Sequence, residues 1–225
     1  MCSHEKVFSL KNKQYTIRLY QPQDRGEVRR ISCETACLGI SRHNLFSDDE
    51  LLADALTLYY TDFEPESCLV AVSDHRVVGY LIGARTIRLM NQVFTSQILR
   101  PLFLKALRRK CFFHRTNRNF LLYVLRSFIR GEFTAPCFSK EYPATLHINL
   151  EKEFTGRGIG SSLIREYLKY LKNNNIAGVH FATFSEGAKS FFLSQGFEML
   201  FQGPRTYLEP YVHHKVMLYI FGKKL

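Results

Sequence analysis

Long apolar stretches are absent from this 225-residue chain. The longest uninterrupted run of note, Phe120 to Leu125, is far shorter than the ~20 residues that cross a bilayer, which argues against a membrane-spanning protein. The N-terminal residues show no apolar block followed by a cleavage site, so we predict no signal peptide and a cytoplasmic location. With 46% hydrophobic and 23% charged residues, the composition is typical of a globular protein with an ample core.

Cysteine motifs are missing as well. The 6 cysteines are scattered, none forms a Cys-x-x-Cys pair, and no Cys/His group has zinc-ligand spacing. We therefore predict reduced thiols and no metal site. Cys33 and Cys37 lie four residues apart and are interpreted as a buried thiol pair. His213 and His214 have no spaced partner for a metal and are interpreted as strand residues.

Acidic residues are absent from the middle of the chain. Residues 85–131 contain eleven Lys/Arg and no Asp/Glu. Residues 1–84 contain nine Lys/Arg and twelve Asp/Glu, and residues 132–225 contain eleven Lys/Arg and eight Asp/Glu. The formal charge of +11 is therefore a local feature. Arginines interleaved with phenylalanines fit a surface for anionic lipid, nucleic acid or an acidic substrate. For most of the basic residues we favour the alternative, a solvated helix face whose positive charge is balanced by acidic residues elsewhere in the chain, such as residues 48–50.

Hydrophobic periodicity predicts an α+β order of elements. Asp24 is expected to cap the first helix and Gly39 to end it, Ser47 precedes the second helix, and Gly131 ends the last of the basic helices. The predicted strands cover residues 15–20, 67–74, 75–86, 145–150, 178–184, 197–201 and 213–221. The predicted helices cover residues 24–38, 47–60, 102–110, 119–131, 163–171 and 186–195.

Three alternating glycines, Gly156, Gly158 and Gly160, lie between a predicted strand and a predicted helix. Such a loop lets backbone N–H groups converge on an anion, and the positive end of the helix dipole adds to the attraction, so a pyrophosphate is the expected ligand. The spacing fits neither a G-x-G-x-x-G fingerprint nor a P-loop, which would end in Gly-Lys-Ser/Thr.

The TGRGIG segment at residues 155–160 resembles the turn motif of the GNAT acetyltransferase superfamily, Gln/Arg-x-x-Gly-x-Gly/Ala, although Thr155 stands where Gln or Arg is usual. A second family element, Asn-x-x-Ala-x-x-Phe-Tyr-x-x-x-Gly-Phe, has counterparts at the same spacing. The resemblance extends from about Tyr15 to Phe221. The residues that carry the second element are Ser185, Ala188, Phe191, Phe192, Gly196 and Phe197.

This resemblance implies one N-acetyltransferase-like domain over residues 1–225, with a basic helical insertion at about residues 85–143. Its central, mixed but mostly antiparallel sheet would be splayed between the fourth and fifth strands and flanked by helices, with acetyl-CoA in the opening and no metal. The cofactor-binding residues implied are Ile148, Leu150, Thr155, Gly156, Arg157, Gly158, Ile159, Gly160, Ser161, Ser162, Ser185 and Phe192.

The implied activity is transfer of an acetyl group from acetyl-CoA to a primary amine by direct attack in a ternary complex. His147 is the first candidate for the base, although it also fits a hydrogen-bonded structural histidine, as His180 does still better. Phe192 replaces the tyrosine that usually protonates the thiolate, so Ser185, Tyr207 and Tyr211 are candidate substitutes. Two alternatives stay open: a weak or inactive CoA-binding module whose basic insertion binds a membrane or nucleic acid, and transfer of a longer acyl group.

Overall fold

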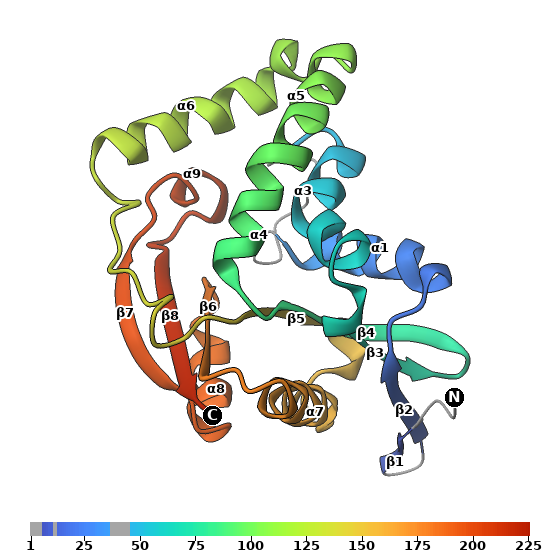
Figure 1. Ribbon diagram of the computed structural model, residues 1–225. Coiled ribbons are helices and arrows are strands. Elements are labelled where there is room, and N and C mark those ends of the chain that lie inside the picture. The colour runs from blue at the N-terminus through green and yellow to red at the C-terminus, as the bar shows by residue number, and fades with distance from the viewer. Residues whose placement is uncertain (1–5, 11–12, 37–45) are drawn as a thin grey trace.

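The computed structural model describes residues 6–10, 13–36 and 46–225 and arranges their strands in two sheets (Figure 1). The first sheet contains, in spatial order, β1 (Lys6–Leu10), β2 (Lys13–Leu19), β3 (Leu69–Ser73), β4 (Arg76–Ala84) and β5 (Thr145–Leu150). The second contains β6 (Gly178–Thr183), β8 (Met217–Lys224) and β7 (Glu198–Pro204). Within both sheets, all strand pairs among the described residues are antiparallel.

The two sheets join at one end of β5 and β6 and diverge beyond it. The Ala144 amide donates to the Gly178 carbonyl at 3.1 Å, and the Ala144 carbonyl accepts from the His180 amide at 2.9 Å. This parallel bridge is the one backbone link between these two strands in the described part of the chain. The splayed, mostly antiparallel fold is thus confirmed. The opening follows the fifth strand rather than the fourth, because β1 adds a strand that periodicity did not predict.

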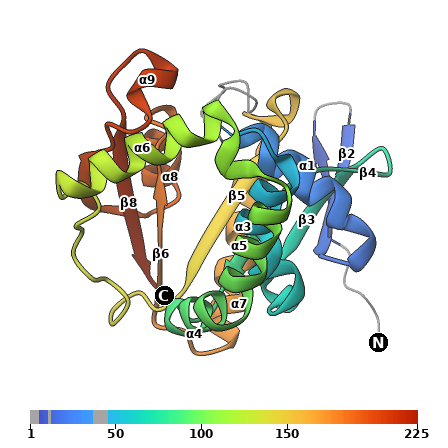
Figure 2. The same cartoon turned by 90° about the horizontal axis from the view of Figure 1, so that it is seen from above.

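Helices cover both faces of the first sheet (Figures 1 and 2). On one face lie α1 (Arg25–Thr35), α3 (Asp49–Asp62), α4 (Ile87–Val93) and α5 (Leu99–Arg108), and α6 (Arg115–Ile129) extends from the end of α5 toward the second sheet. On the other lie α7 (Ile159–Asn173) and, beside the second sheet, α8 (Gly187–Ser194), while the short α9 (Glu209–Val212) lies near α6. Short 3₁₀ turns are η1 (Pro22–Asp24), η2 (Pro65–Ser67), η4 (Cys111–Phe113) and η5 (Lys152–Phe154), and η3 (Phe94–Ile98) is a π-helical turn that joins α4 to α5.

The helix starts differ from the predicted caps. Asp24 precedes α1, but its carboxylate accepts from the Gln21 amide at 2.8 Å and pairs with Arg18, so it stabilises the preceding turn instead. Asp48, not Ser47, caps α3, by accepting from the Leu51 amide at 3.0 Å. Short polar side chains compete for several nearby amides, and tertiary partners decide the outcome. The predicted end at Gly39 and the partner thiol of Cys33, at residue 37, lie outside the described residues.

The predicted hairpin and the two predicted basic helices are confirmed. The hairpin turns at Asp74 and His75, whose φ angles of 48° and 61° are those of a tight primed turn. The two basic helices form, and Gly131 ends the second with a φ of 73°. The described cysteines are free thiols. Among the described residues, no helix is both long and apolar enough to span a bilayer, and no cluster of three or more potential metal ligands occurs.

Two clusters of buried side chains hold the helices to the first sheet. Leu81 and Leu146 pack with α7, while Tyr80 and Ile82, on the opposite face, pack with α1 and α3. Tyr167 of α7 is fully buried, and its hydroxyl donates to the Thr145 carbonyl at 2.8 Å. This contact ties the helix that follows the glycine loop to β5, so it positions the loop beside the open edge of the sheet.

The fit of α7 under β4 gives a stability test. A methyl group at Gly83 would lie 2.1 Å from the Tyr167 hydroxyl oxygen, so Gly83→Ala should lower the free energy of unfolding by about 1–3 kcal/mol through overpacking. The same change at Gly26 of α1 meets no atom within 4 Å and should raise it by up to about 1 kcal/mol, because alanine favours helix. Urea denaturation of the two variants measures both, and equal shifts would contradict this packing.

Candidate active site at the split between the sheets

The glycine loop leads from β5 through η5 to the first turn of α7. Gly156 and Gly158 have φ angles of 71° and 79°, a region that side chains other than glycine's adopt with strain. Gly158 is the N-cap of α7, and none of the described side chains caps this helix end. The first amides of α7 therefore have no intrahelical acceptor and lie at the positive end of the helix dipole, which is a site for an anion.

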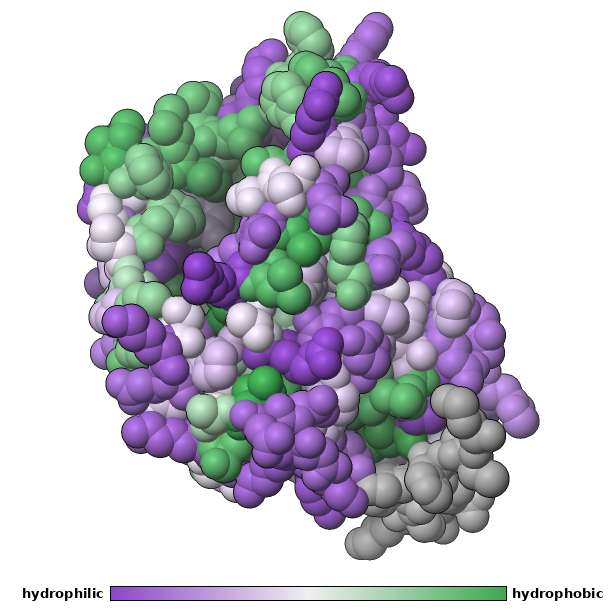
Figure 3. Space-filling view, in the orientation of Figure 1, coloured by the Kyte–Doolittle hydropathy of each residue, from purple (hydrophilic) through white to green (hydrophobic). Residues whose placement is uncertain are grey.

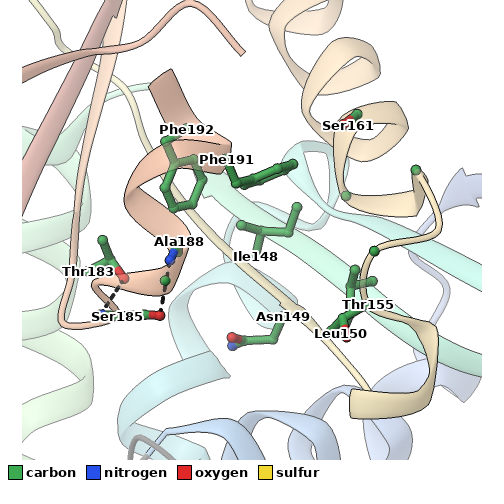
Figure 4. Close-up of a pocket in the computed structure, with 14 residues that line it drawn as sticks. Ile148, Asn149, Leu150, Thr155, Ser161, Thr183, Ser185, Ala188, Phe191 and Phe192 are labelled. Carbon is green, nitrogen blue, oxygen red and sulfur yellow. Dashed lines mark hydrogen bonds between the residues drawn. The ribbon is translucent and has the colours of Figure 1, made fainter. Parts of the chain in front are cut away.

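A pocket of about 680 Å³ opens beside this loop (Figure 4). Thr155 and Ser161 lie at one end of it, Thr183 and Ser185 at the other, and Ile148 lies between them. Its lining is formed by Ile148, Asn149, Leu150, Thr155, Gly156, Gly158, Gly160, Ser161, Thr183, Ser185, Gly187, Ala188, Phe191 and Phe192. An apolar wall with free amides at one end suits a long ligand that carries phosphate at that end.

Most of the residues expected to bind the cofactor line this pocket. Three do not. Ile159 is fully buried in the core, and Ser162 is 4% exposed with its hydroxyl 3.0 Å from that of Tyr15. The Arg157 guanidinium lies over the Phe154 ring, 5.3 Å from its centroid, at the exposed rim of the loop. Since these are side-chain placements, they leave open a contribution from the backbone amides of the same residues.

The pocket is also lined by residues that were not predicted to bind the cofactor. Ala188 and Phe191 belong to the second family element, whereas Asn149, Thr183 and Gly187 were missed altogether. A methyl group at Gly160 would lie 3.2 Å from the Phe191 ring, so the close approach of α7 and α8 depends on this glycine. The sequence signals that could have found these residues were the strand alternation next to the loop and the helical spacing after Ser185. They could not tell which strand residue faces the split.

A second, smaller recess of about 100 Å³ meets the first at the split. His147 lines it, and four residues belong to both recesses: Ile148, Asn149, Thr183 and Phe192. Asn149 is fixed here, because its amide donates to the Tyr80 hydroxyl at 2.7 Å. The gap between β5 and β6 thus connects the side of the first sheet that carries the glycine loop with the side that carries His147.

The His147 ring is accessible to solvent through this recess and lies edge-on to Tyr60, 5.7 Å between ring centroids. The surrounding protein dehydrates the ring, and this lowers the pKa of His147. The imidazole is therefore neutral near pH 7 and has a free lone pair. His180 of β6 differs, since its Nδ1 lies 2.6 Å from the Tyr142 carbonyl, in agreement with a structural role.

Glu151 holds the start of the glycine loop in place. Its carboxylate accepts from Arg76 at 3.0 and 2.7 Å and from Arg30 of α1, and its amide donates to the Val78 carbonyl at 2.9 Å. The loop is therefore anchored to β4 and α1 where it leaves β5. Tyr207 lies apart from both recesses of the split, in a recess with Arg126 and Arg130, where its ring stacks on Phe133 at 5.7 Å.

Comparison with known proteins agrees with this geometry. The model of a protein family described as "Acetyltransferase (GNAT) family" matches residues 40–197, more than half of the chain. The chain belongs to the GNAT acetyltransferase family. Acetyl transfer from acetyl-CoA is the general chemistry of this family. A search of the curated proteins found no match to the sequence.

Solved structures of GNAT proteins share the fold. SsHAT superimposes with a TM-score of 0.70 at 23% identity, over 93% of this chain and 98% of that one. The putative acetyltransferase yncA from Salmonella typhimurium, solved with acetyl-CoA, gives 0.55 at 14%, over 94% of each chain. The ribosomal-protein-alanine N-acetyltransferase from Brucella melitensis gives 0.51 at 18%, over 93% of this chain and 99% of that one.

In this GNAT domain, the position of the usual tyrosine is occupied by Phe192, which is 5% exposed and packs against Phe181 at 4.5 Å between ring centroids. Ser185 lines the pocket, but its hydroxyl oxygen accepts from the Ala188 amide at 3.3 Å and so also supports the start of α8. Thr183 is the other hydroxyl at the split, and its Oγ1 accepts from the Ser185 amide at 3.2 Å. Both side chains retain a hydroxyl proton to donate.

The protein that surrounds the His147 ring predicts how this side chain titrates. NMR titration of the imidazole resonances, assigned by their loss in His147→Gln, should give a pKa below the ordinary value of about 6.5. Protonation is disfavoured there because the charged ring would lose hydration without gaining an acidic partner among the described residues. A pKa at or above the ordinary value would contradict the environment described for this ring.

Proposed function

We propose that this protein is an N-acetyltransferase that transfers the acetyl group of acetyl-CoA to a primary amine in a ternary complex. One observation carries the proposal: the anion-binding loop and a neutral histidine lie on opposite sides of a split that both recesses share. A thioester in the split would meet an amine that enters from the His147 side. Family membership favours transfer over a module that only binds CoA.

The pocket fits acetyl-CoA. The amides at the start of α7 would bind the pyrophosphate, with Ser161 beside them and Arg157 able to add charge at the rim. The pantetheine arm would lie along β5, which is the edge strand of its sheet and so has backbone groups without a strand partner on that side. Ile148, Phe191 and Phe192 would cover the apolar parts of the arm.

His147 is proposed as the base. It would accept a proton from the attacking ammonium group, directly or through a water molecule, so that the neutral nitrogen can attack the acetyl carbonyl. The new C–N bond forms as the C–S bond breaks, the sulfur leaves as a thiolate, and the second proton lost by the nitrogen passes to that sulfur or to solvent. The lowered pKa of His147 supports this role, because the free base is then present at neutral pH.

Phe192 cannot protonate the thiolate, so another hydroxyl is needed if the enzyme uses acid catalysis. We propose Thr183 or Ser185, since both line the pocket at the split and both can donate. Tyr207 is not proposed, because it lies in a different recess. We further propose that the basic insertion at residues 85–143 belongs to the same single domain and shapes the side from which the acceptor enters. The cytoplasmic location stays a prediction.

The loop can be tested with a matched pair at Ser161. Ser161→Glu places a negative charge in the first turn of α7, where it should repel the pyrophosphate, whereas Ser161→Gln has almost the same size without charge. Calorimetric titration with acetyl-CoA should give about tenfold to a hundredfold weaker binding for Glu than for Gln. A carboxylate in this turn favours the helix, so both variants should fold. Equal affinities would argue against phosphate at this loop.

The base can be tested by the pH dependence of CoA thiol release with a panel of primary amines. The kcat/KM of the wild type should rise with pH up to the lowered pKa of His147 and then level off with respect to this group. His147→Gln should lower kcat/KM by about 10²- to 10⁴-fold and remove its rise with pH. His180→Gln is the matched control and should retain both. An unchanged profile in His147→Gln would exclude His147 as the base.

A further inference from the structure

Helix α6 exposes an apolar stripe although the helix is well packed on its other side. Leu121, Leu122, Leu125, Phe128 and Ile129 recur at helical spacing on one face, and the last two are 66% and 76% exposed. The opposite face holds the helix in place, because the Phe120 ring contacts Tyr207 at 6.0 Å and Tyr211 at 6.4 Å.

The stripe continues beyond α6. Figure 3 shows hydrophobic side chains gathered along α6 and again over α5. On α5 the exposed apolar residues are Leu99, Phe103, Leu104 and Leu107, and Phe113, between the two helices, is 76% exposed. We call this set, from Leu99 to Ile129, the apolar surface. Large contiguous apolar surfaces are uncommon on monomeric proteins and mark interaction sites.

Positive charge borders the apolar surface. The two helices and their connection contain no acidic residue. Two of their cations are neutralised from α3, since Lys105 pairs with Asp54 at 2.6 Å and Arg109 pairs with Asp48 at 2.7 Å. The remaining cations are exposed and have no acidic partner among the described residues: Arg100, Arg108, Lys110, Arg115, Arg118 and Arg126. The expectation of a balanced face therefore holds for only part of the segment.

We propose that the apolar surface of α5 and α6 binds the surface of an anionic phospholipid bilayer. The apolar stripe would enter the boundary between headgroups and acyl chains, while the bordering arginines would contact lipid phosphates with their long side chains. In Figure 1, α6 lies on the opposite side of the sheets from α7, so this contact leaves the start of α7 free. The proposal does not depend on the acetyltransferase reaction.

Other occupants fit less well. A second copy of this chain would bring two sets of six unneutralised cations together, which like-charge repulsion opposes. The phosphate backbone of a nucleic acid would pair with the cations. It would not bury the leucine, isoleucine and phenylalanine side chains, because these carry no charge for it to bind. An anionic bilayer covers both components of the surface.

Vesicle sedimentation tests the proposal. The full chain is mixed with vesicles of phosphatidylcholine alone or of equimolar phosphatidylcholine and phosphatidylglycerol. It should sediment with the anionic vesicles, and less so at high salt, because screening weakens the contribution of the cations. Acetyl-CoA binding by each variant shows that it is folded, without any need for turnover.

Two variants test the surface, one that removes apolar side chains and adds negative charge and one that removes positive charge alone. Leu122→Glu/Phe128→Glu/Ile129→Glu should abolish sedimentation, and Arg115→Gln/Arg118→Gln/Arg126→Gln should weaken partitioning by about tenfold to a hundredfold. Leu19→Glu, at a residue 56% exposed on β2, is the apolar control. Lys140→Gln/Lys169→Gln/Lys172→Gln removes the same charge from exposed residues elsewhere. Both controls should sediment like the wild type.

Three outcomes would overturn the proposal. The first is absence of sedimentation with the anionic vesicles. The second is sedimentation that the triple glutamate variant retains. The third is a protein that does not bind vesicles but forms dimers or binds single-stranded RNA, and that loses this interaction with the same substitutions. That result would assign the surface to a second copy or to nucleic acid.

Discussion

The rest of the structure depends on the incomplete pairing of β5 with β6. Backbone N–H and C=O groups are obligatory hydrogen-bonding groups, and a strand edge inside a protein must find partners for them. Ala144 provides them at one end, and beyond it β5 is an edge strand that borders a pocket. An edge of this kind suits a ligand with amide groups, which an acetyl-CoA molecule supplies in its pantetheine arm.

Several contacts keep the split open at a defined width. Tyr167 fixes α7 beneath β5 through the Thr145 carbonyl, and Glu151 anchors the glycine loop through two arginines. Gly160 allows α8 to approach α7 until Phe191 forms part of the pocket wall. The recess on the His147 side is smaller, about 100 Å³ against 680 Å³. On the proposed function, the same gap would hold the phosphates at one end and the proton-accepting His147 at the other.

Much of this arrangement could be predicted from sequence because it depends on local rules. Period-2 and helical patterns located most strands and helices, and the alternating glycines predicted the loop that lines the pocket. The side chains that depend on tertiary packing could not be predicted. Asp24 finds Arg18 instead of its own helix, Tyr207 packs away from the split, and Thr183 reaches it. For residues 119–131 periodicity predicted a helix, but only packing shows which apolar side chains of α6 stay exposed.

Hydrogen exchange measured by mass spectrometry, with and without acetyl-CoA, tests the central claim most directly. If acetyl-CoA lies in the split, its binding should slow exchange in residues 147–150 and 156–162, because amides that now face solvent would donate to the ligand. Exchange in the basic helices at residues 99–129 should be unchanged. Binding without protection at β5 and the glycine loop would contradict the account, because the ligand would then occupy another site.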